Sequence, residues 1–330
     1  VPEIIEERAF LPYGETVNVY FMGGEPSGVA ENAFCTDYDG IINLYYLKGT
    51  EDKWNFDENG LWNGYEVTPV DNEEDIPVAS GYCGAEEGGT NLSWTLAADG
   101  TLTISGTGAM ADYNDSSVIP WYEYKDNIKT LILEEGITGI GKYAFYRCTG
   151  LTGSLVIPES VTSIGQYAFS NCWNLSGKLV IPKSLVEIGN MAFSNCHGFE
   201  AVEVAGENQN YASIDDALYT KDGKTLIYYP GQKTGAYTVH EGTEVIGRMA
   251  FYNANVDSVT LPESVKTIEF KAFAHFDGKV TVKGKLDTIE GEAFSEYGEG
   301  VSVYFIGGAP LNVETGENPS FITDTENEGQ

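Results

Sequence analysis

The sequence predicts a repeat solenoid of leucine-rich type, built mainly from short β-strands with short helical turns. The first observation is a recurring phrase, Ile-Gly/Glu-x-x-Ala-Phe, which ends at Phe10, Phe145, Phe169, Phe193, Phe251, Phe273 and Phe294, with a looser copy at Phe34. The second is its spacing, because Phe145, Phe169 and Phe193 lie 24 residues apart and the last two steps are 22 and 21 residues. A period of this size is typical of solenoids whose coils bury their apolar sides against their neighbours.

Each repeat begins with a short strand. In the fullest copy Leu155 and Ile157 alternate with Val156, which is the period of a β-strand. Pro158 should end this strand, because proline has no N–H group to donate to a neighbouring strand. The same pattern returns at 179–182 and 259–262, so we expect one short strand at the start of each coil.

The second half of each repeat carries a corner and an interior plug. Val161 and Ile164 should point inward, and Gly165 should permit the corner through its backbone freedom. Ala168-Phe169 then begins a short helical or turn segment that fills the coil. We therefore expect the repeat phenylalanines to form the structural core: Phe145, Phe169, Phe193, Phe251, Phe273 and Phe294.

One repeat carries an insertion. The step from Phe193 to Phe251 is 58 residues, and most of the excess lies in 206–237. Asp222-Gly223 stands between two β-prone runs, which indicates a β-hairpin, and we expect this hairpin to protrude. The insert also holds five tyrosines, which either pack the hairpin onto the solenoid or form a patch for a protein or glycan partner. They are Tyr211, Tyr219, Tyr228, Tyr229 and Tyr237.

A longer periodicity orders the whole chain. Residues 5–26 align without a gap with residues 289–310, at an offset of 284, and 14 of 22 positions match. The expected order is the C-terminal end of a preceding leucine-rich array (1–70), an acidic linker (71–80), a β-rich cap (81–127), the solenoid with its hairpin (128–310, insert 206–237) and an acidic tail (311–330). Because the chain begins in mid-repeat, we expect an internal or processed fragment.

Charge excludes two classes of partner. The chain has 50 acidic and 18 basic residues, for a net charge of −32. Such a surface repels phosphate backbones and anionic lipid. No stretch approaches the roughly 18 apolar residues that a membrane span requires. We therefore expect no binding to nucleic acid and no membrane insertion.

Three cysteines share a register. Cys148, Cys172 and Cys196 each follow a repeat phenylalanine by three residues, so adjacent coils should stack them. A ladder of small buried side chains is the expected role, since free cysteine is among the most buried residue types. The alternatives are a disulfide, which would leave one of three thiols unpaired, and a metal site, for which zinc-type spacing or nearby histidines are not convincing. We expect neither metal nor cofactor.

Catalytic residues are not expected. His197, His240 and His275 have no carboxylate or nucleophile at a register that would bring the two together. Phosphate-loop and hydrolase motifs are missing from the sequence. The acidic clusters at 37–40 and 71–75 lack the spacing of an EF-hand, so we expect solvated loops in preference to calcium sites. The chain is therefore not expected to be an enzyme; a deep pocket lined by carboxylates would favour an unrecognised hydrolase instead.

The chain resembles the BspA-like leucine-rich repeat family of surface proteins. The resemblance rests on the repeat phrase at 157–172, the cap sequence at 81–110, the insert around 210–230 and the closing sequence 301–310. It implies a secreted or cell-surface bacterial protein, which in some members is an adhesin for host matrix proteins. It implies no shared catalytic site.

The favoured hypothesis is a non-enzymatic extracellular protein, located at the bacterial cell surface, that binds a host matrix or surface protein. The alternative is a glycan-binding module of a larger surface protein. In both cases the repeat phrase builds a scaffold, so function is expected where the phrase is interrupted or faces outward.

Overall fold

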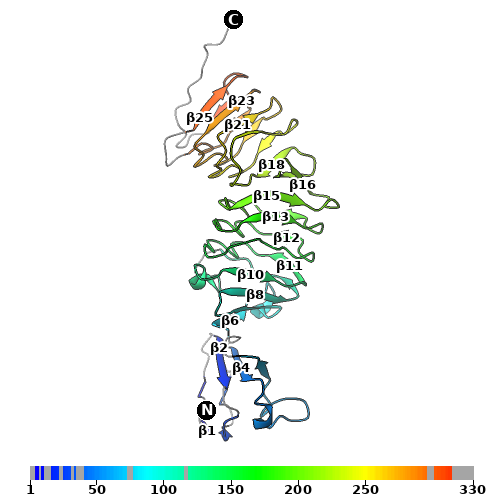
Figure 1. Ribbon diagram of the computed structural model, residues 1–330. Helices are drawn as coiled ribbons and strands as arrows, with labels where there is room; N and C mark the ends of the chain where they lie inside the picture. Colours follow the sequence, from blue (N-terminus) through cyan, green and yellow to red (C-terminus); the bar gives the residue numbers. More distant parts are fainter. Residues whose placement is uncertain are drawn as a thin grey trace.

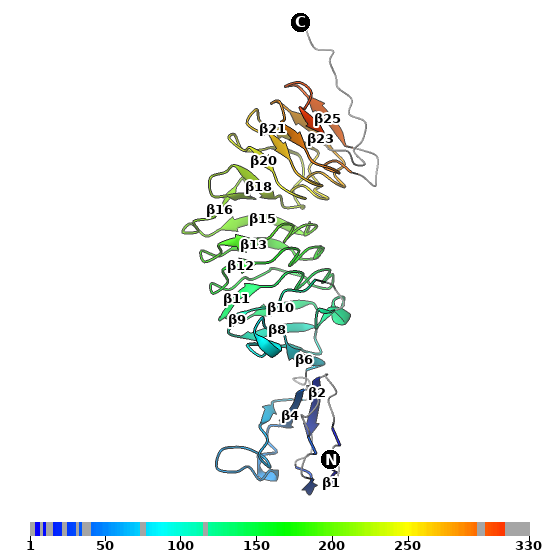
Figure 2. The same ribbon diagram turned by 180° about the vertical axis from the view of Figure 1, so that it is seen from behind.

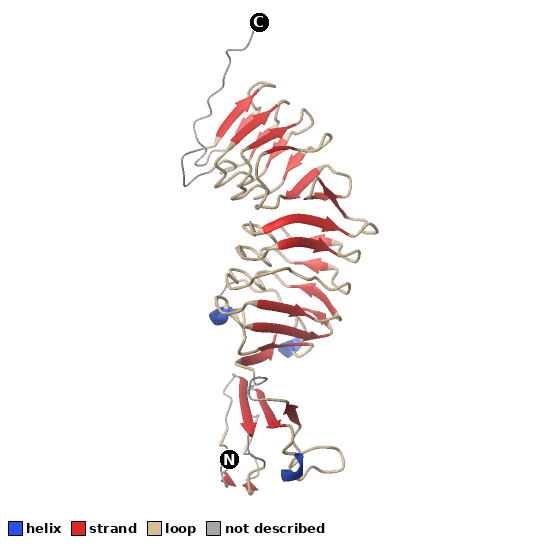
Figure 3. Cartoon of the chain, viewed as in Figure 1, coloured by secondary structure: helices blue, strands red, loops and turns tan. Residues whose placement is uncertain are grey.

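The computed structural model describes residues 4–6, 9–10, 16–21, 25–30, 33–34, 41–72, 77–114, 118–295 and 301–313. These residues form a long stack of β-coils, with the N-terminal strands at one end and the C-terminal coils at the other (Figure 1). Almost all regular structure is strand (Figure 3), and the helical pieces are short 3-10 turns, among them η1 (Glu51–Lys53), η3 (Glu87–Gly89) and η5 (Tyr122–Tyr124). The predicted solenoid fold is confirmed.

The N-terminal part is a small parallel arrangement around an aromatic core. Its strands are β1 (Ile4–Ile5), β2 (Thr16–Phe21), β3 (Gly28–Val29), β4 (Ile41–Leu47) and β5 (Val67–Val70). β2, β4 and β5 form one parallel sheet, and β1 pairs with β3. The ring centroid of Phe21 lies 5.3 Å from those of Trp54 and Trp62, so edge-to-face aromatic packing holds this part together.

Four strands cover the first coil of the solenoid. These strands are β6 (Ala79–Tyr82), β7 (Leu92–Leu96), β8 (Thr101–Gly106) and β9 (Gly108–Ala109). β6, β7 and β8 pair antiparallel, and β8 then pairs parallel with the first solenoid strand. Leu92, Leu102 and Ile104 are completely buried beneath them. Ala79 and Ser80, which were predicted to belong to the linker, already lie in β6.

The first stack of coils follows the 24-residue repeat. Its strands are β10 (Thr130–Leu133), β11 (Ile137–Ile140), β12 (Ser163–Ile164), β13 (Gly177–Ile181), β14 (Glu187–Ile188) and β15 (Phe199–Val204). β11, β12 and β14 pair in parallel with Ile140, Ile164 and Ile188 in register. The repeat spacing therefore places equivalent residues directly above one another.

The insert forms a hairpin that is built into the stack. β16 (Tyr211–Ile214), β17 (Ala217–Thr220) and β18 (Thr225–Tyr228) pair antiparallel, and β18 then pairs parallel with β20 (Val245–Ile246). Figure 2 shows β16 and β18 between the coils of β15 and β20. Leu218, Tyr219 and Leu226 are completely buried. The expectation that the hairpin protrudes is therefore wrong, because β17 and β18 both contribute side chains to the core.

The second stack continues to the C-terminal end of the described chain. Its further strands are β19 (Ala236–Thr238), β21 (Ser258–Leu261), β22 (Thr267–Ile268), β23 (Lys279–Val282), β24 (Thr288–Ile289), β25 (Ser302–Phe305) and β26 (Asn312–Val313). β24 pairs with β26 as β1 pairs with β3, at the offset of 284 found in the sequence. β26 lies inside the predicted acidic tail, and 314–330 lie outside the described residues.

A ladder of aromatic rings runs through both stacks. Ring centroids of Phe145 and Phe169 are 5.1 Å apart, those of Phe169 and Phe193 are 5.8 Å apart, and all three side chains are buried. Trp121 stacks on Phe145 at 5.4 Å and begins the ladder. In the second stack the rings of Phe251, Phe273 and Phe294 continue it at 4.9 and 5.3 Å. The structure thus places all six repeat phenylalanines in the core.

The segment around each of these phenylalanines is a turn, not a helix. From Phe145 to Phe273, the residues two before and two after each of these phenylalanines have positive φ, as at Tyr167 (57°) and Asn171 (65°). Their N–H groups and that of Phe169 point along the solenoid axis and donate to carbonyls of the next coil, at 3.2, 2.9 and 2.8 Å. A helix would have used these donors within the coil, so the turn is what links one coil to the next.

The repeat glycine has a different role from the predicted one. Gly165 does not have positive φ. A Cβ atom on it would lie 2.5 Å from the backbone nitrogen of Lys142 and 2.8 Å from the carbonyl carbon of Gly141. A Cβ on Gly189 would meet Gly165 in the same way, at 2.7 Å. Glycine is therefore required for close contact between neighbouring coils, not for backbone freedom.

The three stacked cysteines are buried free thiols. The Sγ atoms of Cys172 and Cys196 each donate to the carbonyl of the phenylalanine in the preceding coil, at 3.0 Å. Burial raises the pKa of Cys148 and of Cys196 to about 12. Burial also raises the pKa of Cys172 well above its usual value, with the neighbouring cysteines adding to the shift. Cys35 lies outside the described residues.

These thiols should be unreactive in the folded protein, because the thiolate is the reacting form and access is closed. In a Cys35→Ser variant at pH 8, we expect no reaction of Cys83, Cys148, Cys172 or Cys196 with a disulfide reagent within minutes. All four should react at once in guanidinium chloride. Rapid reaction of even one thiol per molecule in the folded variant would contradict the buried ladder.

Candidate interaction site at the hairpin junction

The five tyrosines of the insert lie inside the solenoid. Each has less than a tenth of its surface exposed. Tyr219 and Tyr237 share a hydrogen bond of 2.8 Å between their hydroxyls, and the Tyr228 hydroxyl donates to the Cys196 carbonyl at 2.7 Å. Tyr211 accepts the N–H of Ile188 at 2.7 Å. The tyrosines thus pack the hairpin, and partner contacts through them stay a prediction.

Two of the tyrosines connect the aromatic ladders of the two stacks. The ring of Tyr228 lies 6.2 Å from Phe193, and the ring of Tyr229 lies 4.9 Å from Phe251. Their hydroxyls have raised pKa values because of burial. The buried residues nevertheless separate into two clusters at this point, one for each stack. The hairpin is therefore a junction between two cores.

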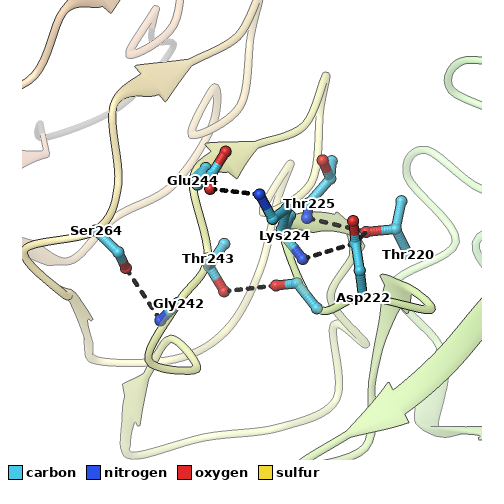
Figure 4. Close-up of polar contacts among 9 residues, drawn as sticks. Thr220, Asp222, Lys224, Thr225, Gly242, Thr243, Glu244 and Ser264 are labelled. Carbon is cyan, nitrogen blue, oxygen red and sulfur yellow. Dashed lines mark hydrogen bonds and ion pairs between the residues drawn. The ribbon is translucent and has the colours of Figure 1, made fainter.

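The hairpin turn is fixed to the following coil. Asp222 accepts the Thr220 hydroxyl at 2.7 Å and the Lys224 N–H at 3.0 Å, and Gly223 at the tip has a φ of 71°. The Thr243 hydroxyl donates to the Gly223 carbonyl at 3.1 Å (Figure 4). Lys224 also forms an ion pair of 2.8 Å with Glu244. These contacts hold the hairpin in one position relative to the second stack.

The hairpin coil lacks the corner that other coils carry. Leu226 pairs with Ile246, and Tyr229 donates to the Ala250 carbonyl as a repeat phenylalanine would. Only three positions separate Leu226 from Tyr229, whereas five separate Ile246 from Phe251. The hairpin coil is therefore two residues short at this corner. As a result, no corner segment fills the space between the corner of the preceding coil and that of the following coil.

The missing corner leaves a cavity of about 230 Å³, which we call the corner notch. Met191 belongs to the corner on one side of it, and Arg248 and Met249 belong to the corner on the other. Ile188 and Ile227 line it from the strands, and Thr220 and Thr225 line it from the hairpin. The notch is thus bordered by both stacks and by the insert.

Three backbone donors lose their acceptors at the junction. In the preceding coil the N–H groups of Tyr167, Phe169 and Asn171 donate to the next coil. The equivalent N–H groups of Met191, Phe193 and Asn195 have no acceptor among the described residues. Met191 and Phe193 line the notch. Unpaired backbone donors of this kind need water or a ligand, because leaving them buried without a partner is costly.

Acidic side chains hold the rim of the notch. The Arg248 guanidinium contacts Glu290 at 3.0 Å, and the Arg248 N–H donates to Glu269 at the same distance. Burial, and next the charge of Glu290, raise the pKa of the Glu269 carboxyl above its usual value. Two carboxylates therefore compensate the one arginine, and the rim carries no surplus of positive charge.

A polar bridge closes one side of the junction. Asn195 accepts from Asn253 at 3.3 Å, and the Nδ1 atom of His197 lies 3.2 Å from Asn195 and 3.3 Å from Asn253. Burial lowers the pKa of His197. The bridge joins the turn of the last coil in the first stack to the turn of the first regular coil in the second stack. It supplies polar contacts where the backbone bonds are missing.

Hydrogen exchange should reveal the orphaned donors directly. The Phe169 amide is hydrogen-bonded and buried, whereas the Phe193 amide is not bonded. In the intact protein we expect the Phe193 and Met191 amides to exchange on the order of 100-fold faster than those of Phe169 and Tyr167, since exchange requires the bond to open. Residue-resolved exchange by NMR provides the measurement. Equal protection at Phe193 and Phe169 would mean that the ladder continues through the junction.

The two histidines outside the junction make aromatic contacts. His240 lies beside the Tyr219 ring and His275 beside the Tyr252 ring, both as edge contacts. Within the described residues, no group of three or more His, Cys, Asp or Glu side chains could hold a metal ion. The acidic cluster at 37–40 and most of the cluster at 71–75 lie outside the described residues. Among the helices that the structure does describe, none has the length and apolar character of a membrane span.

Sequence reasoning missed the corner notch, although its signal was present. Leu226 and Tyr229 replace the isoleucine and phenylalanine of the repeat phrase, with two residues deleted between them. The deletion becomes visible only once Leu226 is known to pair with Ile246. Met191 and Met249, which both line the notch, had no motif of their own.

Comparisons with known proteins agree with the fold. The sequence profile described as the BspA type leucine rich repeat region matches residues 120–221 and 225–307, in six copies. No curated protein sequence matches the chain. A leucine-rich repeat protein of known structure from Eubacterium ventriosum is 25% identical, with 71% of this chain and 75% of that chain covered and a TM-score of 0.41.

Two further solved structures are similar. A leucine rich cell surface protein from Faecalibacterium prausnitzii is 19% identical, with 65% of this chain and 87% of that chain covered and a TM-score of 0.36. The pneumococcal vaccine antigen PcpA is 17% identical, with 65% and 91% covered and a TM-score of 0.35. The profile alone spans more than half of the chain and follows its coils. The chain belongs to the BspA type leucine-rich repeat family.

Proposed function

We propose that the chain is a non-enzymatic, extracellular bacterial repeat protein that binds a protein ligand at the cell surface. The observation that carries this proposal is the division between a filled interior and a patterned exterior. Phenylalanine and aliphatic side chains fill the interior of the described coils. A ligand would therefore bind to the outer surface. Family membership supports a scaffold that presents its outer face.

The exterior carries an exposed aliphatic strip. Ile132, Val156 and Val180 occupy equivalent positions in three successive coils and are 45%, 70% and 45% exposed. A single exposed aliphatic residue is ordinary, but a contiguous row on a monomer is a feature of interaction surfaces. The row therefore supports a protein ligand, for which host matrix and surface proteins are the proposed class.

Direct binding tests this function. The intact chain is immobilised and presented with a panel of purified matrix proteins, such as fibronectin, laminin, fibrinogen and collagen. We expect saturable binding with a Kd below tens of micromolar, which is the range of weak but specific protein contacts. A Val156→Asp/Val180→Asp variant should bind less well, and the matched Thr260→Asp/Thr281→Asp variant should not. Absence of binding to every panel member would reject adhesion by this chain.

One observation favours glycan binding as a second candidate. A cleft of about 790 Å³ lies between the N-terminal part and the cap, and it is lined by Tyr20, Tyr82 and Tyr124 together with Asn18 and Glu123. Aromatic faces combined with polar side chains suit a sugar ring. A glycan array distinguishes the candidates, because a Tyr82→Ala variant should lose glycan binding while matrix-protein binding stays unchanged.

A further inference from the structure

The corner notch is a place where the solenoid is prepared for one more short piece of chain. At an ordinary boundary the next coil supplies a corner whose carbonyls accept three backbone N–H groups. At the junction those donors, on Met191, Phe193 and Asn195, are present while the corner is missing. The junction therefore keeps the space and the backbone donors that a corner segment would use, although that segment is missing.

Building on the protein-binding function proposed above, we infer that the corner notch seats a loop of a protein partner. One apolar side chain of that loop enters between Met191 and Met249. The backbone carbonyls beside it accept the N–H groups of Met191 and Phe193, as the carbonyls of Asn190 and Ala192 accept those of Tyr167 and Phe169. The partner thus replaces the deleted coil corner.

The shape and lining of the notch fit this occupant. Its volume of about 230 Å³ equals roughly seven or eight times the share of one water molecule in the liquid. It therefore admits a side chain with its adjoining backbone. Methionine side chains on both walls adapt to irregular apolar groups, which is why they recur at binding surfaces. Ile188 and Ile227 complete the apolar lining.

The charges around the notch select the kind of loop. Glu269 and Glu290 already engage Arg248, so its guanidinium is not free to receive an anion. Glu187 stands exposed next to Ile188, and the chain as a whole carries −32. A free phosphate or carboxylate is therefore disfavoured, and a loop whose apolar residue is flanked by Lys or Arg is electrostatically complementary.

The first test uses a peptide that copies the deleted corner. The probe is the blocked tetrapeptide acetyl-Gly-Arg-Met-Ala-amide, which reproduces residues 247–250 of the next coil. It is titrated into the intact, isotope-labelled protein while amide signals are followed by NMR. We expect the Met191 and Phe193 signals to shift and their hydrogen exchange to slow, whereas the Tyr167 and Phe169 signals stay fixed. No shift at Met191 and Phe193 up to about 5 mM peptide, beyond the millimolar range of the weakest specific contacts, would overturn the inference.

A matched pair of variants tests the seat itself. Met191→Trp fills the notch, and Lys271→Trp places the same side chain at the equivalent corner position of the second stack, where φ is also positive (60° and 55°). We expect Met191→Trp to weaken peptide binding at least tenfold and Lys271→Trp to leave it unchanged. Equal binding by both variants would overturn the inference. If Met191→Trp does not fold, as judged by circular dichroism, the wild-type titration decides alone.

The same variants separate this inference from the proposed function. If a matrix protein binds wild type and Met191→Trp equally well, the chain is a protein binder and the notch is not its seat. If the peptide occupies the notch but no protein of the panel binds, the notch is supported and adhesion to those proteins is rejected. Loss of both protein and peptide binding in Met191→Trp alone supports both.

Discussion

Replacing Phe169 with alanine should lower the free energy of unfolding by about 3–5 kcal/mol, the range for buried aromatic side chains. Phe169 is fully buried, and its ring stacks at 5.1 Å on Phe145 and at 5.8 Å on Phe193. The substitution therefore removes contacts in two coil interfaces at once. In a solenoid each coil is stabilised by its neighbours, so the loss is not confined to one repeat. Urea unfolding followed by circular dichroism measures it.

Val156→Ala is the matched control, because Val156 belongs to the same repeat and is 70% exposed. Its effect should stay within about 0.5 kcal/mol, as for other surface substitutions. A loss below about 1 kcal/mol for Phe169→Ala, against the range for buried aromatics, would show that the ring does not fill its coil.

Gly165→Ala should be the second most damaging change, although it adds one carbon atom. The new Cβ would lie 2.5 Å from the Lys142 nitrogen, and backbone cannot move aside as a flexible side chain can. The two coils must separate to relieve the contact, which weakens the hydrogen bonds between them. We expect a loss of roughly 1–3 kcal/mol, as for other overpacked sites, measured by the same urea unfolding.

Gly206→Ala provides the comparison for this effect. A Cβ on Gly206 meets nothing within 4 Å, and Gly206 does not have positive φ. The Gly206→Ala variant should be as stable as the wild type or slightly more stable, since alanine restricts the conformations of the unfolded chain. Similar losses at both glycines would argue against close coil contact as the reason for the repeat glycine.

The sequence was informative about several properties that repeat along the chain, although the strand expected at 155–157 is not formed. The spacing of Phe145, Phe169 and Phe193 predicted a solenoid, and the rings do stack in the core. Asp222-Gly223 predicted a hairpin, and β17 and β18 pair there. Each of these features depends on local pattern or on a period, both of which can be read from one chain.

The sequence was less informative about relations between coils. Gly165 was assigned to a corner through its backbone freedom, because a glycine kept for close contact looks the same in sequence as one kept for positive φ. The hairpin was expected to protrude, because the burial of Tyr219 and Leu226 depends on their fit between two stacks. The corner notch depends on the pairing of Leu226 with Ile246, a long-range register that no single repeat reveals.

The missing ladder bonds also determine how the molecule would respond to tension. The boundary between the coils of Phe169 and Phe193 is held by three corner hydrogen bonds and by a continuous core. At the junction those bonds are missing, the core divides into two clusters, and the coils of the second stack are tilted against those of the first (Figure 1). We therefore expect a pull along the long axis to separate the solenoid first at the junction, into two stacks that each keep their own core. A partner loop held in the notch would tie the stacks together, so that attachment itself would strengthen the rod against the force it transmits.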